Sequence, residues 1–93
     1  MRQLKSHEMM QWWEDTSKIA RDEIIKEGAK YFFDKYGVYP KFVWVNKDIY
    51  IDNEPILDYD WGEIEVKSDK GVCKDIFWFS VDGKLLEDKR VEE

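Results

Sequence analysis

The chain has 93 residues, of which 43% are hydrophobic and 16% aromatic, and its formal net charge is -6. So many large apolar side chains can build one hydrophobic core, which argues against a disordered chain. An acidic chain without a basic stripe is a poor candidate for direct binding to nucleic acid or to an anionic membrane. No apolar run in the sequence approaches the roughly 18 residues of a membrane span.

The location of the protein follows from two features of the sequence. Charged residues such as Lys5 and Glu8 interrupt the N-terminal region, which therefore lacks the apolar stretch of a signal peptide. Cys73 is the single cysteine and cannot form an intramolecular disulfide. These features predict a cytoplasmic protein made in a reducing compartment. The length predicts one domain over residues 1–93.

The first sixteen residues are expected to form an arm or a short helix. Ser6 is suited to cap its N-terminus, with Glu8 in the first turn. The polar residues 15–17 could cap a second helix. The alternative is one continuous helix over residues 7–36, but it would be about 45 Å long, which is long for so small a domain.

An apolar cluster lies within this arm: Met9, Met10, Trp12 and Trp13. Two adjacent residues of a helix point about 100° apart, so one surface cannot bury both tryptophans. In one interpretation, one Trp seals the core and the other is half exposed. In the other, the four residues form a patch for a partner or for a homodimer, because Met and Trp are enriched at interfaces.

The main helix is predicted over residues 17–36. One apolar stripe follows the helical period at Ile25, Ala29, Phe32 and Tyr36, and a weaker one at Ala20, Ile24, Gly28 and Tyr31. Gly28 is unfavourable inside a helix, and close packing against a strand would explain it. Gly37 supplies the left-handed residue that ends a helix, and Pro40 prevents continuation.

After Pro40 the spacing of the apolar residues changes from the helical period to the short period of strands, which predicts a β-rich part over residues 41–86. Residues 42–45 are apolar on both faces and should form a central strand. Residues 52–54, between the apolar runs 49–51 and 55–57, are expected to form a hairpin or a short turn. The remaining expected elements are strands over 63–67 and 75–81, a tight turn at Asp82-Gly83, a short edge strand over 84–86 and a charged tail over 87–93. The expected fold is therefore α+β, with the main helix packed on a mainly antiparallel, meander-like sheet of four or five strands.

Seven acids and no Lys or Arg lie between Asp48 and Val66. This stretch carries -7 against -6 for the whole chain, so all other residues sum to +1. One interpretation is a binding surface for a basic protein, carried by Asp52, Glu54, Asp58, Asp60 and Glu63. The alternative is that the acids only keep an aromatic-rich sheet soluble and its edges unpaired.

Catalytic and metal-binding patterns are weak in this sequence. His7, beside Glu8, is the only histidine and is read as a surface residue, and Cys73 is read as a partly buried strand cysteine. The run starting at Asp58 faintly resembles a calcium loop, but Glu63 stands where that loop needs glycine. We therefore expect no enzyme, no bound metal and no cofactor.

The sequence favours a non-enzymatic protein-interaction or accessory factor, of the kind that a phage or mobile element encodes. The alternative is an acidic inhibitor that imitates nucleic acid, and a small metal-dependent hydrolase comes third. An interaction protein should expose an apolar patch, and a mimic should spread its acids along one face. An enzyme should have a concave pocket with convergent polar groups.

Overall fold

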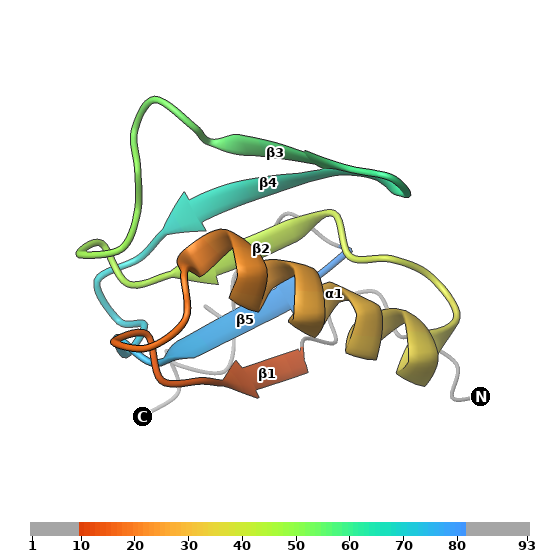
Figure 1. Ribbon diagram of the computed structural model, residues 1–93, viewed down its shortest axis with the longest axis horizontal. Coiled ribbons are helices and arrows are strands. Elements are labelled where there is room, and N and C mark those ends of the chain that lie inside the picture. The colour runs from red at the N-terminus through yellow and green to blue at the C-terminus, as the bar shows by residue number, and fades with distance from the viewer. Residues whose placement is uncertain (1–9, 82–93) are drawn as a thin grey trace, which may run out of the picture.

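The computed structural model describes residues 10–81, which contain one helix and one five-stranded mixed sheet. The elements in chain order are β1 (Met10–Trp13), α1 (Arg21–Tyr36), β2 (Phe42–Val45), β3 (Ile56–Tyr59), β4 (Gly62–Ser68) and β5 (Ile76–Ser80). The strand order across the sheet is β1-β5-β2-β4-β3 (Figure 1). The predicted α+β class is confirmed.

The expected meander is wrong, because β2 and β4 are parallel neighbours while the other three pairings are antiparallel. After β2 the chain crosses to the sheet edge before β3 begins. The β3–β4 hairpin then returns β4 to the side of β2 in the same direction. A connection between parallel strands must be long, and residues 46–61 supply it.

The first element is a strand, so the expected helix or irregular arm is wrong at residues 10–13. Met10 and Trp12 face the core on one side of β1, while Gln11 and Trp13 are exposed on the other. This alternation has the period of a strand, and β1 pairs with β5 from Met10–Phe79 to Trp13–Ile76. A continuous helix over 7–36 is thereby excluded. Ser6, His7 and Met9 lie outside the described residues.

The helix begins at Arg21 rather than at residue 17, because Asp15 closes a turn before it. The Asp15 carboxylate accepts hydrogen bonds from the Ser17 amide at 3.0 Å and the Ser17 hydroxyl at 2.6 Å. Ala20 is the N-cap and makes no side-chain cap bond. Residues 15–17 therefore cap a turn and not the helix, which corrects the sequence prediction.

The predicted end of the helix is confirmed. Gly37 has φ 83°, and its N–H donates to the Phe33 carbonyl at 2.7 Å. This left-handed conformation costs a residue with a Cβ about 1 kcal/mol or more. The first predicted stripe is buried throughout, whereas Tyr31 of the second stripe is half exposed.

Close packing at Gly28 is also confirmed. A Cβ at this position would lie 2.5 Å from two ring carbons of Phe79 and 3.2 Å from Cγ of Trp12. The helix backbone can approach β1 and β5 at this point because glycine has no side chain.

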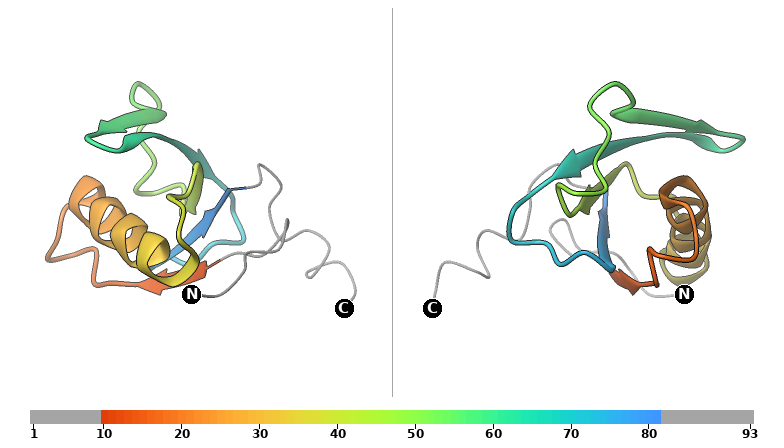
Figure 2. Two further views of the ribbon diagram at one scale, coloured as in Figure 1. Left: turned by 90° about the vertical axis from the view of Figure 1, so that its right-hand side faces the viewer. Right: turned by 60° about the vertical axis from the view of Figure 1, so that its left-hand side comes forward.

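The sheet curves around α1, so that β1 and β3 lie at opposite edges of the curve (Figure 2). We call the side toward α1 the inner face and the opposite side the outer face. One core fills the inner side, with helix residues such as Phe32 and strand residues Met10, Val43, Val45, Leu57, Ile64, Val66, Phe77 and Phe79. Strand alternation places Phe42, Trp44, Ile56 and Trp78 on the outer face.

Of the predictions for β2 and the segment that follows it, the central strand is confirmed and the hairpin is wrong. β2 lies in the middle of the sheet as predicted, but residues 49–51 do not form a strand. The Asn46 carbonyl accepts from the Ile49 amide at 3.1 Å, and the Asn46 side chain bonds both the Asp48 amide and the Val72 carbonyl. These turn bonds use the polar groups that a strand would need. The expected strand over 84–86 lies outside the described residues.

Candidate functional site

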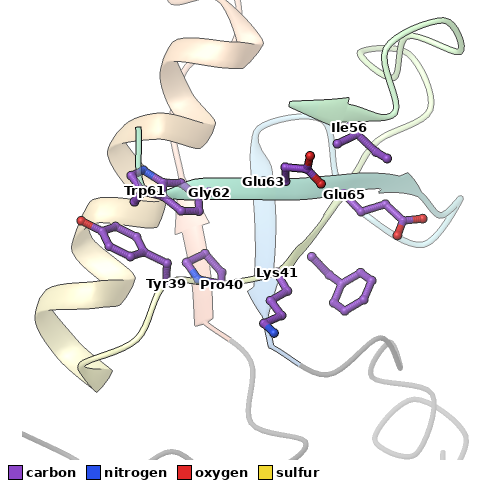
Figure 3. A pocket seen from close by; sticks show the side chains of 9 residues that line it. Tyr39, Pro40, Lys41, Ile56, Trp61, Gly62, Glu63 and Glu65 are labelled. Carbon is purple, nitrogen blue, oxygen red and sulfur yellow. The ribbon is translucent and has the colours of Figure 1, made fainter. Parts of the chain in front are cut away.

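A groove of about 540 Å³ lies on the outer face where β4 and the start of β2 meet the β3–β4 turn. We call it the outer groove, and its lining residues are Tyr39, Pro40, Lys41, Phe42, Ile56, Trp61, Gly62, Glu63 and Glu65. Tyr39, Pro40 and Trp61 lie at one end, and Ile56 and Glu65 at the other (Figure 3). Its volume falls in the range of ordinary ligand sites, and its walls are mainly apolar and aromatic.

Four rings stack at one end of this groove and connect three separate elements. The ring centroids of Phe33 and Tyr39 are 4.4 Å apart, those of Tyr39 and Trp61 are 4.3 Å apart, and those of Trp61 and Tyr59 are 5.2 Å apart. The Tyr39 and Trp61 planes differ by only 3°. We call these four residues the aromatic stack. It joins α1 to the β3–β4 hairpin and so fixes one end of the groove.

Tyr59 anchors the stack to the start of the helix. Its hydroxyl donates to the Asp22 carbonyl at 3.0 Å. Burial raises the pKa of the Tyr59 phenol, and the nearby Asp22 carboxylate raises it further. The phenol therefore keeps its proton at neutral pH and remains a hydrogen-bond donor.

Asp58 and Glu63 form a cross-strand pair of like charge beside the groove. The Val66 amide donates to the Pro55 carbonyl at 2.6 Å, and the Glu65 amide donates to the Lys41 carbonyl at 2.9 Å. Antiparallel alternation then makes the Asp58–Glu63 pair non-hydrogen-bonded, the type whose side chains approach most closely. Within residues 10–81 neither carboxylate has an ion-pair partner. We call these two residues the acidic pair.

The charges around the groove are divided between its two sides. On the β2 side, Lys41 lines the groove, and the Lys67 ammonium lies 5.5 Å from the centroid of Phe42. Lys67 also lies 3.8 Å from the Glu65 carboxylate, so that carboxylate has a counter-charge. Among the described residues, the acidic pair on the β3 side has no counter-charge within ion-pair distance.

The structure separates the five acids that the sequence assigned to one binding surface. Asp58 and Glu63 lie together, whereas Glu54 lies 3.5 Å from the guanidinium of the buried Arg21, at the start of α1. Asp52 is exposed in the turn before β3, and Asp60 is exposed in the β3–β4 turn. The structure therefore brings Asp58 and Glu63 together as cross-strand neighbours and places Glu54 beside Arg21.

The four residues predicted to mediate self-association are also separated. Met10 is in the core, and the Trp12 ring lies 5.1 Å from the ring of Tyr31. Trp13 is 66% exposed on the outer face of β1, and Met9 lies outside the described residues. As one of the two interpretations predicted, one Trp packs against the core and the other is exposed. The two residues lie on a strand, however, and not on a helix.

A second, smaller cleft of about 330 Å³ lies between β1 and α1. Its floor contains Trp12, Ile19 and Ile24, and three carboxylates line it, those of Glu14, Glu23 and Glu27. The buried Trp12 indole nitrogen has no hydrogen-bond partner among the described atoms. Like the outer groove, this cleft has both apolar and acidic lining residues. Its lining includes Ile24, which is buried in the core.

Residues 10–81 include no group of three or more His, Cys, Asp or Glu side chains placed to hold a metal ion. Cys73 is exposed in the loop between β4 and β5, which corrects the prediction of a partly buried strand cysteine. In the same part of the chain, no helix is long and apolar enough to cross a membrane.

Sequence reasoning missed the aromatic and apolar half of the outer groove. Tyr39 and Trp61 stand in turn segments, where isolated aromatics carry no periodic signal. The sequence pattern does not distinguish Ile56 from other strand residues, although Ile56 is 53% exposed. The signal that could have found the site is the placement of aromatics near turn glycines, since Tyr39 lies two positions after Gly37 and Trp61 directly precedes Gly62.

Comparison with known proteins gives no further information about this site. No known protein family matches the chain, and no curated protein or solved structure is significantly similar to it.

Proposed function

We propose that this protein is a non-enzymatic interaction module that binds a basic protein partner through the outer groove and the acidic pair. The observation that carries the proposal is the acidic pair itself, two acidic residues directly opposite each other on adjacent strands beside an apolar groove. Like charges placed directly opposite each other on a sheet destabilise it. A bound Lys or Arg would relieve that repulsion.

The surroundings of the acidic pair favour a protein over a small ion. Aromatic residues are enriched at protein interfaces, and the groove is lined by Tyr39, Phe42 and Trp61. The exposed Ile56 adds apolar area next to Asp58. A partner that presents an apolar side chain close to a basic one would match both features. Electrostatic complementarity of this kind speeds association at low salt.

The nucleic-acid mimic receives less support from the arrangement of the acids. A mimic needs a regular row of negative charges, but Glu54 is turned toward Arg21 at the start of α1. Lys41 and Lys67 further interrupt the outer face with positive charge.

The test measures, by calorimetry, the binding of a lysine–valine peptide, a short synthetic peptide that repeats Lys-Ser-Val-Ser and so places lysine and valine two positions apart on one face of an extended strand. We expect binding that weakens steeply as salt rises, and no binding of the same peptide with glutamate in place of lysine. The double variant Asp58→Asn/Glu63→Gln should bind at least tenfold more weakly, a loss of about 1.4 kcal/mol.

The matched control is Glu27→Gln/Asp34→Asn, which removes the same charge from exposed positions on α1. This control should bind as the wild type does. If the control loses binding and the groove variant keeps it, the basic partner binds elsewhere and the proposal is wrong. Failure of the lysine–valine peptide to bind the wild type at all would also contradict it.

The exposure of Trp13 favours a second candidate function, self-association along β1 as a homodimer. β1 has no charged side chain and has β5 as its neighbour on one side. Sedimentation of the wild type and of Trp13→Ser would test this candidate. A concentration-dependent dimer that Trp13→Ser abolishes would support it, and a wild-type monomer at high micromolar concentration would exclude it.

A further inference from the structure

We infer that the basic partner binds as an added β-strand along the open edge of β3. This inference rests on the proposed function, because it names the conformation in which the partner segment occupies the same site. β3 is the last strand in the sheet order, with β4 on one side and no neighbour among the described residues on the other (Figure 1). Addition of an extended segment to such an edge is a recurrent mode of peptide recognition.

The hydrogen bonds of β4 fix which backbone groups of β3 face this edge. Glu65 donates its amide to β2, while Val66 donates its amide to Pro55 at the start of β3. Residues of β4 therefore alternate between the two neighbours, and the Leu57–Ile64 pair belongs to the hydrogen-bonded set. It follows that the N–H and C=O groups of Ile56 and Asp58 point toward the open edge.

The same two residues present their side chains on the outer face. Ile56 is 53% exposed, and Asp58 is exposed as the edge member of the acidic pair. An added strand would place its own outer-face residues beside them, two positions apart in sequence. The expected recognition pattern is therefore a basic residue beside Asp58 and an aliphatic residue two positions away, beside Ile56. A long basic side chain can also reach Glu63 on β4.

The edge also carries features that limit what can bind there. Asp58 carries a negative charge on the edge strand, so this charge opposes the approach of a second copy of the same acidic hairpin. Pro55, directly before β3, turns its backbone groups toward β4, where its carbonyl accepts from the Val66 amide, so Ile56 and Asp58 are the residues of β3 whose backbone groups face the open edge. The strand thus accepts a short segment, and it selects that segment by opposite charge.

The test uses the lysine–valine peptide in two N-methylated forms, methylated either at every lysine and valine or at every serine. Since the side chains and backbone amides of a strand alternate, only one of the two forms loses the amides that face β3. We expect that form to bind at least tenfold more weakly, and the other form to bind nearly as well as the unmethylated peptide.

Amide hydrogen exchange on the wild-type protein supplies an independent measurement. Peptide binding should slow exchange at Ile56 and Asp58 and should change Leu57 much less, because Leu57 already belongs to the internal ladder. If both methylated peptides bind as the parent does and Ile56 and Asp58 stay unprotected, strand addition is wrong while the proposed function stands. If the parent peptide fails to bind, both proposals fall.

Discussion

The two edges of the sheet are built in opposite ways. β1 sends Met10 and Trp12 into the core and has no charged side chain. β3 sends only Leu57 fully into the core, and it carries the charge of Asp58 on its other side. Each strand has four residues, so the difference lies in side chains and not in length.

Hydrogen bonds to Asp75 also hold the segment that follows β1 in place. The Asp75 carboxylate accepts hydrogen bonds from the Thr16 amide at 3.1 Å and from the Thr16 hydroxyl at 2.8 Å. The Glu14 amide donates to the Asp75 carbonyl at 3.0 Å. The β1 edge is therefore part of the folded scaffold, whereas the β3 edge is held chiefly by β4 and the aromatic stack and has no neighbouring strand among the described residues on its other side.

The largest expected effect comes from breaking the scaffold edge at its contact with the helix. Gly28→Val would push a side chain into the Phe79 ring and toward Trp12, and we expect a loss of about 3 kcal/mol in unfolding free energy. Denaturant titration would measure it. The control variant Lys30→Val introduces valine at an exposed position of the same helix and should lower the unfolding free energy by no more than about 0.5 kcal/mol. Equal stabilities for the two variants would refute the close contact.

A smaller effect is expected when the β3 edge loses the aromatic stack. Trp61→Ala removes the ring between Tyr39 and Tyr59 and should lower stability by about 2 kcal/mol. Trp13→Ala, the matched change at the exposed side of β1, should stay within about 0.5 kcal/mol. Thermal melting would show the contrast as roughly 4–8 °C per kcal/mol. Similar melting temperatures for both variants would mean that the stack does not hold the hairpin.

A pH-dependent effect is expected at the fastening of β1. The Thr16 hydroxyl, and then the Thr16 amide, lower the pKa of Asp75 below its ordinary value of 3.8. A lowered folded-state pKa gives stability that is complete above the unfolded pKa and is lost as pH falls through the folded one. Asp75→Ala should therefore be less stable than the wild type at neutral pH, and the difference should shrink at strongly acidic pH.

The matched control for this prediction is Asp52→Ala, at an exposed acid outside the β1 contact. Unfolding measured against pH should show no comparable difference for it. A gap between Asp75→Ala and the wild type that stayed constant down to acid would contradict the assignment.

The smallest expected effect is a gain. Asp58→Asn removes the repulsion within the acidic pair and should raise stability by roughly 0.5 kcal/mol at low salt, while it weakens binding of the basic peptide. High salt should erase the gain in stability. Glu65→Gln should give no gain, because Glu65 has Lys67 as a counter-charge. A loss of stability in Asp58→Asn would show that the two carboxylates of the acidic pair do not destabilise the sheet by repulsion.

The sequence could predict those features that depend on neighbouring residues. Gly37 and Pro40 ended the helix correctly because capping is local, and Gly28 indicated a close contact because glycine is costly inside a helix. The strand at Met10–Trp13 was missed, because four residues with two adjacent tryptophans fit a helix as well as a strand until β5 is known to lie beside them.

The candidate site shows the same limit. The acidic stretch pointed to Asp58 and Glu63, but only the β3–β4 register shows that they stand opposite each other. Glu54 looked equivalent in sequence, and its contact with Arg21 depends on how a distant loop folds back. Tyr39 and Trp61 stack across 22 positions of sequence, a distance at which no local pattern carries information.

The position of β5 has a consequence for how the chain acquires its fold. β5 is the last of the described strands, yet it lies between β1 and β2, which come first among the strands. The sheet therefore cannot close until the segment around Phe79 has been synthesised and has found its place between two strands formed earlier. Contacts between segments so far apart close slowly, so we expect this small domain to fold only once β5 has been synthesised and more slowly than a helical protein of its size.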